Sequence, residues 1–247
     1  MTLPVFISSA NFQPGQTVVL DGDEGRHAVT VRRIRVGERI ELVDGSGSRA
    51  ICEVISVNKN SLEVIIDSVH TEARADVNFT VVQALAKGDR SDLALEILTE
   101  VGVDSISPWS AAHSISKWDE TNKGLLKWQR VVREASKQAR RAWIPQISDL
   151  KSTSQIAELM AVADLAIVLH ESAHESLAQV TVPKHGSVVV VVGPEGGISP
   201  DELATFAQAG AQILRMGSSV MRTSTAGGVA LGVLMSATKR WEITASE

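Results

Sequence analysis

The sequence is poor in cysteine, since Cys52 is the only one in 247 residues. One cysteine excludes an internal disulfide framework and fits a reducing cytoplasm. Hydrophobic residues make up 44% of the chain and charged residues 21%, which is ordinary for a globular protein. A chain of this length forms one large domain or two modest ones, and it buries enough surface to fold without covalent staples.

Long apolar runs are also absent from the sequence. None reaches the roughly 18 residues that a membrane-spanning helix needs. The first residues, MTLPVFISSANF, lack a basic region followed by a long apolar core, so no secretory signal is expected. We therefore predict a cytoplasmic protein with no membrane partner.

The charge is unevenly distributed. The whole chain carries −5, which by itself argues against a nucleic-acid partner. Residues 113–151, however, hold nine Lys or Arg against four acids, a local excess of five positive charges, so the remainder carries −10. Because salt screens distant charges, a local basic segment on an acidic protein can still bind a polyanion.

The first 70 or so residues have the pattern of short strands separated by Gly and Asp turn signals. A short helix is expected at Asp23–Arg33, and the polar stretch 71–77 is the expected linker. This pattern predicts a small β-barrel. Its candidate strands are Pro4–Ile7, Thr17–Leu20, Glu38–Val43, Arg49–Val57 and Ser61–Val69.

From Asn78 onward, strands and helices alternate, which predicts an α/β sheet. Helices are expected at Ser91–Val101, closed by Gly102, and at Thr225–Trp241. Another is expected to open at Ser199 with a capping box. The β-branched runs are typical of parallel strands covered on both faces. The expected strands are Phe79–Leu85, Ser105–Pro108, Leu165–Leu169, Val188–Val192 and Gln212–Met216.

A basic amphipathic helix is expected at Lys127–Trp143. Its apolar side chains repeat at helical spacing, and its basic side chains share a different face. Guanidinium groups on one face suit phosphate contact, whereas a solvated surface helix would have the same pattern. The segment alone leaves both interpretations open. The basic positions are 130, 133, 137, 140 and 141.

Two loops after expected strands are rich in small residues. Gly193–Ile198 follows a valine run, at the edge of the sheet where open α/β proteins bind ligands. Its glycines let backbone N–H groups approach a ligand, although the spacing fits neither a dinucleotide fingerprint nor a P-loop. A tight turn explains this loop nearly as well.

The second loop spans residues 216–228. We expect Thr223 or Ser224 to cap the helix that follows. Gly227 and Gly228 weaken that helix, so we expect close packing of another backbone there, with either a ligand pocket or helix contact as the reason.

His170–His174 matches the H-E-x-x-H motif of zinc proteases. Zinc chemistry requires both histidines on one face of a helix and a third ligand. Here the motif begins directly after the expected strand Leu165–Leu169, so its first residues should lie in a loop. We therefore interpret it as pocket lining and predict no metal.

Seven groups of residues, in the same order, resemble the RsmE family of the SPOUT methyltransferases, over nearly the whole chain. Singly each is weak, but together they are specific. They are His27 with Val31-Arg32-Arg33 and Gly37; Lys87-Gly88-Asp89-Arg90; Glu100-Val101-Gly102-Val103; Trp128 with Glu134-Ala135, Gln138, Arg141 and Pro145; Leu169-His170-Glu171; Gly193-Pro194-Glu195-Gly196-Gly197 with Glu202; and Met216-Gly217, Val220-Met221-Arg222-Thr223 and Thr225-Ala226.

The resemblance implies an α/β fold: a PUA-like RNA-binding β-barrel over residues 1–72 and a SPOUT trefoil-knot methyltransferase domain over 73–247. It implies a homodimer with cofactor pockets near the subunit interface. The implied activity is S-adenosylmethionine-dependent methylation of N3 of a uridine in 16S rRNA of the small ribosomal subunit.

The resemblance also assigns site residues. Arg222 is the candidate catalytic residue, either stabilising deprotonated uracil or anchoring its loop. The implied cofactor-binding residues are Leu169, His170, Glu171, Gly193, Pro194, Glu195, Gly196, Gly197, Met216, Gly217, Val220, Met221, Arg222, Thr223, Thr225 and Ala226. The candidate RNA-binding residues are Arg33, Lys87, Arg90, Arg130, Arg133 and Arg141.

Three positions depart from the family pattern: Ser224 stands where Glu is common, Ile97 where Lys is common, and His113 where Arg is common. Roles of those side chains in the family do not carry over. Two alternative functions stay open: a methyltransferase of the same fold acting on another base or on a ribose 2′-OH, and a non-catalytic RNA-binding protein of ribosome assembly.

Overall fold

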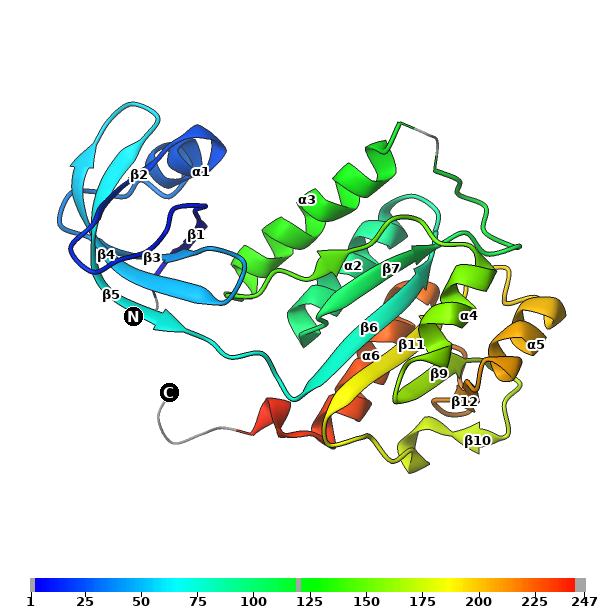
Figure 1. The fold of residues 1–247 in the computed structure, drawn as a ribbon. Coiled ribbons are helices and arrows are strands. Elements are labelled where there is room, and N and C mark those ends of the chain that lie inside the picture. The colour runs from blue at the N-terminus through cyan, green and yellow to red at the C-terminus, as the bar shows by residue number, and fades with distance from the viewer. Residues whose placement is uncertain (1–2, 119–120, 243–247) are drawn as a thin grey trace. The chain divides into compact units, whose positions relative to one another are not determined.

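The computed structural model describes residues 3–118 and 121–242 (Figure 1). The chain forms two compact units: Met1–Arg74 with Ser136–Ile144, and Ala75–Ala135 with Pro145–Glu247. Asp119 and Glu120, two acids of the basic segment, lie outside the described residues. In the described part, no helix is long and apolar enough to cross a membrane.

The first unit contains a five-stranded sheet in the order β1-β3-β4-β5-β2. β1 pairs with β3 in parallel, and the other pairs are antiparallel. The helix expected at 23–33 is present as α1 (Gly22–Arg26), which continues into a π-helical turn, η1 (His27–Val31). The five expected strands are confirmed as β1 (Val5–Ile7), β2 (Thr17–Leu20), β3 (Arg39–Val43), β4 (Ser48–Val57) and β5 (Leu62–Thr71).

The core of this unit consists of side chains from alternating strand positions. Phe6, Ile40, Leu42 and Leu62 are completely buried. Cys52 lies among them, and burial raises the pKa of its thiol to about 12. The single thiol is therefore a protonated part of the apolar core.

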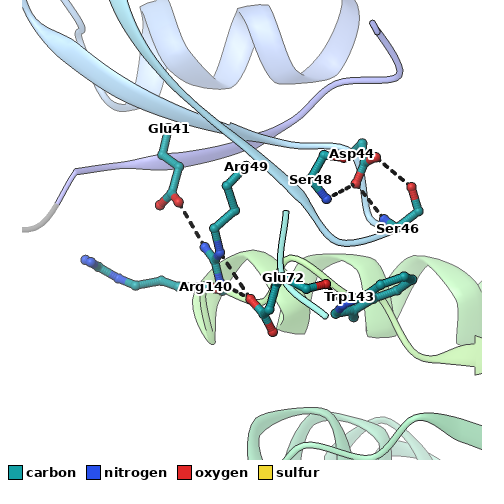
Figure 2. A network of polar contacts seen from close by, with 8 residues as sticks. All are labelled: Glu41, Asp44, Ser46, Ser48, Arg49, Glu72, Arg140 and Trp143. Atoms are coloured by element: carbon teal, nitrogen blue, oxygen red, sulfur yellow. Dashed lines mark hydrogen bonds and ion pairs between the residues drawn. The ribbon is translucent and has the colours of Figure 1, made fainter. Parts of the chain in front are cut away.

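A charged network joins residues 136–144 to the strands (Figure 2). The Arg49 guanidinium contacts the Glu41 carboxylate at 2.9 Å and that of Glu72 at 3.1 Å, and it donates to the Arg140 carbonyl at 2.8 Å. Trp143 Nε1 donates to the Glu72 carbonyl at 3.0 Å. One arginine thus ties three segments together.

The turn between β3 and β4 meets the same segment. Asp44 Oδ1 accepts from the backbone N–H of Ser46 at 2.7 Å and of Ser48 at 2.9 Å. Burial raises the pKa of the Asp44 carboxyl, but these hydrogen bonds outweigh it and the net shift is downward. A Cβ at Gly47 would overlap the Trp143 ring, and Gly47 has φ +102°, so this position requires glycine.

The basic helix is shorter than predicted. α3 covers Lys123–Gln138, so the expectation that it reaches Trp143 was wrong. Arg140 adopts a left-handed φ of +55°, which ends the helical path. Trp143 instead forms an isolated bridge with Ser46.

The second unit contains a seven-stranded, fully parallel sheet in the order β10-β12-β9-β11-β6-β7-β8. The central valines, Val188–Val192, are buried, as predicted for a strand covered on both faces. The strands are β6 (Val77–Ala84), β7 (Ser105–Trp109), β8 (Gln146–Ile147), β9 (Leu165–Leu169), β10 (Glu175–Ser176), β11 (Gly186–Val192) and β12 (Gln212–Arg215).

Helices cover both faces of this sheet (Figure 1). Ile156, Met160 and Phe206, from α4 and α5, pack in one cluster with valines of β11. α6 packs against α2, β11 and β6. The helices are α2 (Asp89–Val101), α4 (Thr153–Ala161), α5 (Pro200–Gln208) and α6 (Thr223–Ser236), with short turns η2 (Leu177–Gln179) and η3 (Lys239–Trp241).

The double glycine of α6 packs tightly, but against side chains rather than against the backbone that was expected. A Cβ at Gly227 would lie 3.0 Å from the Leu98 side chain, and one at Gly228 would overlap that of Ile97. The helix begins at Thr223 and ends at Ser236, so the expected range of Thr225–Trp241 was displaced. α4, with its capping box of Ser152 and Gln155, was not predicted.

Candidate cofactor and active site

A cavity of about 460 Å³ opens at the carboxyl ends of β9, β11 and β12. Three loops form its wall: the residues after β9, the glycine loop after β11 and the loop before α6. The lining residues are Arg90, Leu169, His170, Glu171, Val192, Gly193, Pro194, Glu195, Gly196, Gly197, Ile198, Leu214, Arg215, Met216, Gly217, Ser218, Ser219, Val220, Met221, Arg222, Thr223 and Ala226.

The structure brings nearly all the expected cofactor-binding residues to this cavity. Thr225 is the exception: it lies in the first turn of α6, and its hydroxyl donates to the Arg222 carbonyl at 3.3 Å. The sequence analysis missed Arg215, although it ends a strand whose carboxyl end faces the cavity. Whether each lining residue contacts a ligand stays a prediction.

The glycine loop has little spare room. A Cβ at Gly193 would lie 2.6 Å from Cγ1 of Ile198, and one at Gly196 would lie 2.9 Å from Cβ of His113. Gly197 adopts φ +77°, in the left-handed region. The loop is therefore a tight turn that also forms part of the cavity wall, so the two interpretations of its sequence are compatible.

A buried polar relay connects two of the loops. The Thr223 hydroxyl donates to the Gly193 carbonyl at 2.7 Å and accepts from Gln83 Nε2 at 3.0 Å. Gln83 is only 1% exposed, at the end of β6. The expectation that Thr223 or Ser224 caps α6 was wrong, because Arg222 occupies the N-cap position without a side-chain cap.

Glu202 is a buried carboxylate that connects the residue after the glycine loop, Ser199, to the segment after β7. It accepts from the Ala112 N–H at 2.8 Å, from Ser199 N–H at 3.0 Å and from the Ser199 hydroxyl at 2.8 Å. The Ser199 N–H bond, together with the Glu202 N–H donating to the Ser199 hydroxyl at 3.4 Å, forms the predicted capping box of α5. Burial raises the pKa of this carboxyl, but the hydrogen bonds outweigh it and the net pKa is lowered.

The segment after β7 reaches the same loop from the other side. His113 Nδ1 lies 3.1 Å from the Gly196 carbonyl oxygen and 3.1 Å from that of Gly197. The Ser116 hydroxyl donates to the Ala86 carbonyl at 3.0 Å. His113 is one of the three departures from the family pattern, and its side chain makes a polar contact to the glycine loop.

The H-E-x-x-H sequence does not form a helix. Residues 170–174 make a turn between β9 and β10, in which His170 Nδ1 accepts from the Ser172 N–H at 3.2 Å. The His170 N–H donates to the Leu214 carbonyl at 2.9 Å, which joins the start of this turn to β12. Within residues 3–118 and 121–242, no group of three His, Cys, Asp or Glu is placed to hold a metal ion.

The six candidate RNA-binding residues occupy different places. Arg90 lines the cavity, and the nearby Lys87 is exposed. Arg130 and Arg133 lie on α3, Arg130 fully exposed and Arg133 half-buried. The other two belong to the first unit: Arg33 is exposed with φ +56°, and Arg141 is half-buried.

Comparison with known proteins identifies both parts of the chain. A family model described as an RNA methyltransferase domain matches residues 73–235, and one described as an RNA methyltransferase PUA domain matches residues 20–67. These matches, together with the parallel sheet, confirm the expected fold class of an α/β methyltransferase domain after a small PUA-like domain.

Curated relatives share these features over most of their length. The Ribosomal RNA small subunit methyltransferase E of Mycobacterium bovis is 44% identical over 94% of this chain and 91% of its own. The protein of that name from Bacillus subtilis is 26% identical over 89% of this chain and 90% of its own.

Solved structures agree. Ribosomal RNA small subunit methyltransferase E from Neisseria gonorrhoeae, bound to S-adenosylmethionine, matches with a TM-score of 0.87 and 28% identity over 95% of this chain and 98% of its own. A Legionella pneumophila protein, solved with the same cofactor bound, has a TM-score of 0.88 and 27% identity over 96% of this chain and 99% of its own. The motif-based resemblance is thereby confirmed, and the chain belongs to the ribosomal RNA small subunit methyltransferase E family.

Proposed function

We propose that this protein uses S-adenosylmethionine (SAM) to methylate N3 of a uridine in 16S rRNA of the small ribosomal subunit. The observation that carries the proposal is the cavity, because three loops bring to it nearly all the residues that the family resemblance assigns to the cofactor. The Neisseria and Legionella relatives bind SAM, which supports the same cofactor here. The protein is expected to work in the cytoplasm.

The residues of the cavity fit SAM. Its volume lies in the range of roughly 300–1,000 Å³ typical of small-molecule sites. Leu169, Ile198 and Leu214 supply apolar surface, and the glycines leave backbone N–H and C=O groups accessible to a polar ligand. Glu171 adds an acidic side chain suited to a cationic cofactor.

The chain's own contribution to methyl transfer is alignment and charge stabilisation. The cofactor, when bound, supplies a methyl group on a positively charged sulfur. Arg222 lines the cavity and is exposed, so its guanidinium is available to the uracil oxygens. Loss of the imide proton places negative charge on those oxygens, which a fixed cation stabilises.

The RNA must present an unstacked base to this cavity, since N3 is hidden in a paired base. We propose that six basic residues contact RNA phosphates. Such contacts contribute affinity that does not depend on the base sequence of the RNA. The residues are Arg33, Lys87, Arg90, Arg130, Arg133 and Arg141. If they do, the logarithm of the binding constant should fall steeply with the logarithm of salt concentration, whereas a flat response would reject the footprint.

We also propose that the protein is a homodimer. Leu93 on α2 is 43% exposed, and Val229 and Val233 on the adjacent α6 are 41% and 39% exposed. A second copy would bury this apolar face, close to Arg90 at the cavity. Light scattering should give twice the chain mass, and Val229→Glu should halve it.

Methylation of 30S particles and of free rRNA with isotope-labelled SAM, followed by nucleoside mass spectrometry, tests the activity. N3-methyluridine is the expected product. Another methylated base or a 2′-O-methyl nucleoside would support the alternative substrate. Absence of both methyl transfer and SAM uptake by calorimetry would support the non-catalytic alternative.

A further inference from the structure

His113 holds the glycine loop by a contact that its chemistry restricts to one form. Its Nδ1 is 3.1 Å from both the Gly196 and Gly197 carbonyl oxygens. Carbonyl oxygens only accept hydrogen bonds, so Nδ1 carries the proton and is shared between them. The two acceptors belong to adjacent peptide groups, so one side chain contacts both.

The backbone just before His113 is itself anchored. The Ala112 N–H donates to the buried Glu202 carboxylate at 2.8 Å, and Glu202 Oε1 also accepts from the Thr153 hydroxyl at 3.3 Å. Trp109 Nε1 donates to that same hydroxyl at 3.2 Å. His113 therefore extends from a fixed base, because its neighbours are bonded to α4 and α5.

The loop cannot move toward His113, because Gly196 is already packed against it. A Cβ at Gly196 would lie 2.9 Å from the His113 Cβ and 3.2 Å from its carbonyl oxygen. Gly193 to Gly197 line the cavity, whereas His113 does not. His113 thus contacts the outer side of the loop whose other side faces the ligand.

We infer that His113 is a positioning residue, a latch that holds the glycine loop in the shape that receives the cofactor. Without it, the Gly196–Gly197 peptide group keeps only the hydrogen bond from its N–H to the Pro194 carbonyl, at 2.9 Å, and both carbonyls lose the imidazole donor, so more of the loop must be ordered when the ligand binds. This inference rests on the proposed function for the identity of the ligand. It predicts a change in cofactor affinity with little change in the rate of methyl transfer at saturation.

The test compares His113→Ala with His113→Asn, whose side-chain N–H₂ can donate from about the position of Nδ1. By calorimetry, His113→Ala should bind SAM about twofold to tenfold more weakly, as expected for one lost hydrogen bond, and His113→Asn should recover most of the affinity. KM for SAM should rise by a similar factor while kcat stays nearly unchanged. His185→Ala is the matched control, since His185 is exposed at the opposite end of β11.

A second readout needs no cofactor. In the unliganded protein, amide hydrogen exchange of the peptide covering 193–198 should be faster in His113→Ala than in wild type, and should return toward wild type in His113→Asn. Equal exchange and equal SAM affinity in wild type and His113→Ala would overturn the latch, as would equal losses in the alanine and asparagine variants. Wild-type protein that takes up no SAM would refute the proposed function instead, while the exchange data would still decide the latch.

Discussion

Two arginines show how differently the two units use charge. The Arg49 side chain in the first unit is engaged in structural contacts, since it contacts two carboxylates and a carbonyl (Figure 2). Arg222 in the second unit is exposed on the cavity wall, and within the described residues its side chain makes no hydrogen bond or ion pair. The loops around Arg222 are instead held by mostly backbone-directed contacts, of which those of Thr223 and Glu202 are largely buried and that of His113 is exposed.

The cavity therefore keeps its shape without a contact from the Arg222 side chain. An arginine that the fold does not need is available for a ligand, whereas one that bridges three segments is not. Substitutions should therefore separate the two: changes at Arg222 should affect turnover, and changes at the buried contacts or at Arg49 should affect stability.

The largest effect is expected from Arg222→Ala. Loss of a cation that stabilises the developing anion should lower kcat by about 100- to 1,000-fold. SAM affinity and Tm should stay close to wild type, as calorimetry and thermal unfolding would measure. The kcat of Arg222→Lys, which keeps the charge but not the guanidinium, should lie between those of wild type and Arg222→Ala. Undiminished turnover in Arg222→Ala would remove this residue from the mechanism.

Thr223→Val should produce the largest loss of stability. The substitution keeps the shape but leaves the Gly193 carbonyl and Gln83 Nε2 without their hydroxyl partner, which costs about 1–3 kcal/mol in free energy of unfolding. Denaturant unfolding measures it, with Thr223→Ser as the control that keeps the hydroxyl. If the serine variant loses as much as the valine variant, the relay is not the cause.

Glu202→Gln should cost a similar amount, about 1–3 kcal/mol at neutral pH, because glutamine has a single acceptor oxygen and its NH2 cannot accept from the backbone N–H of Ala112 or Ser199 that it would face. The folded-state pKa of Glu202 is lowered, so its contribution is fully present above its ordinary pKa near 4.5 and is lost as pH falls through the folded value. The stability difference between wild type and variant should thus be constant at neutral pH and shrink in acid. A difference that grows on acidification would contradict the assignment.

Arg49→Met should have the smallest effect, about 1 kcal/mol, because its side chain is 23% exposed and solvent screens its ion pairs. Arg39→Met is the control: its pair with Asp67 at 3.1 Å is between side chains that are 56% and 38% exposed, so almost no loss is expected. If both variants unfold at the same denaturant concentration as wild type, the ion pairs of Figure 2 make no measurable contribution to the free energy of unfolding.

Sequence reasoning found those parts of the molecule that depend on local pattern. The valine strand, the capping box of Ser199 and the glycine loop all follow from neighbouring residues, and they place the cavity correctly. The end of α3 was missed because it depends on the left-handed backbone of Arg140, which the amphipathic pattern does not reveal.

Contacts between segments that are far apart in the chain could not be predicted from the sequence. Gln83 and Thr223 are 140 residues apart, and only the folded sheet brings them together. Thr223 was expected to cap its own helix, the local use of a hydroxyl, whereas the structure directs it to the Gly193 carbonyl in another loop. Tertiary competition for a hydrogen-bonding group has no local signal.

The burial of Cys52 makes the native chain chemically silent toward thiol-directed dyes. Its side chain is inaccessible, and its pKa near 12 leaves almost no thiolate at neutral pH. A cysteine introduced on the rim of the cavity would then be the single reactive site, so a fluorophore attached there would report loop movement without background labelling. The Cys52 thiol becomes reactive only when the five-stranded sheet unfolds. Its rate of labelling would therefore report the unfolding rate of the first unit.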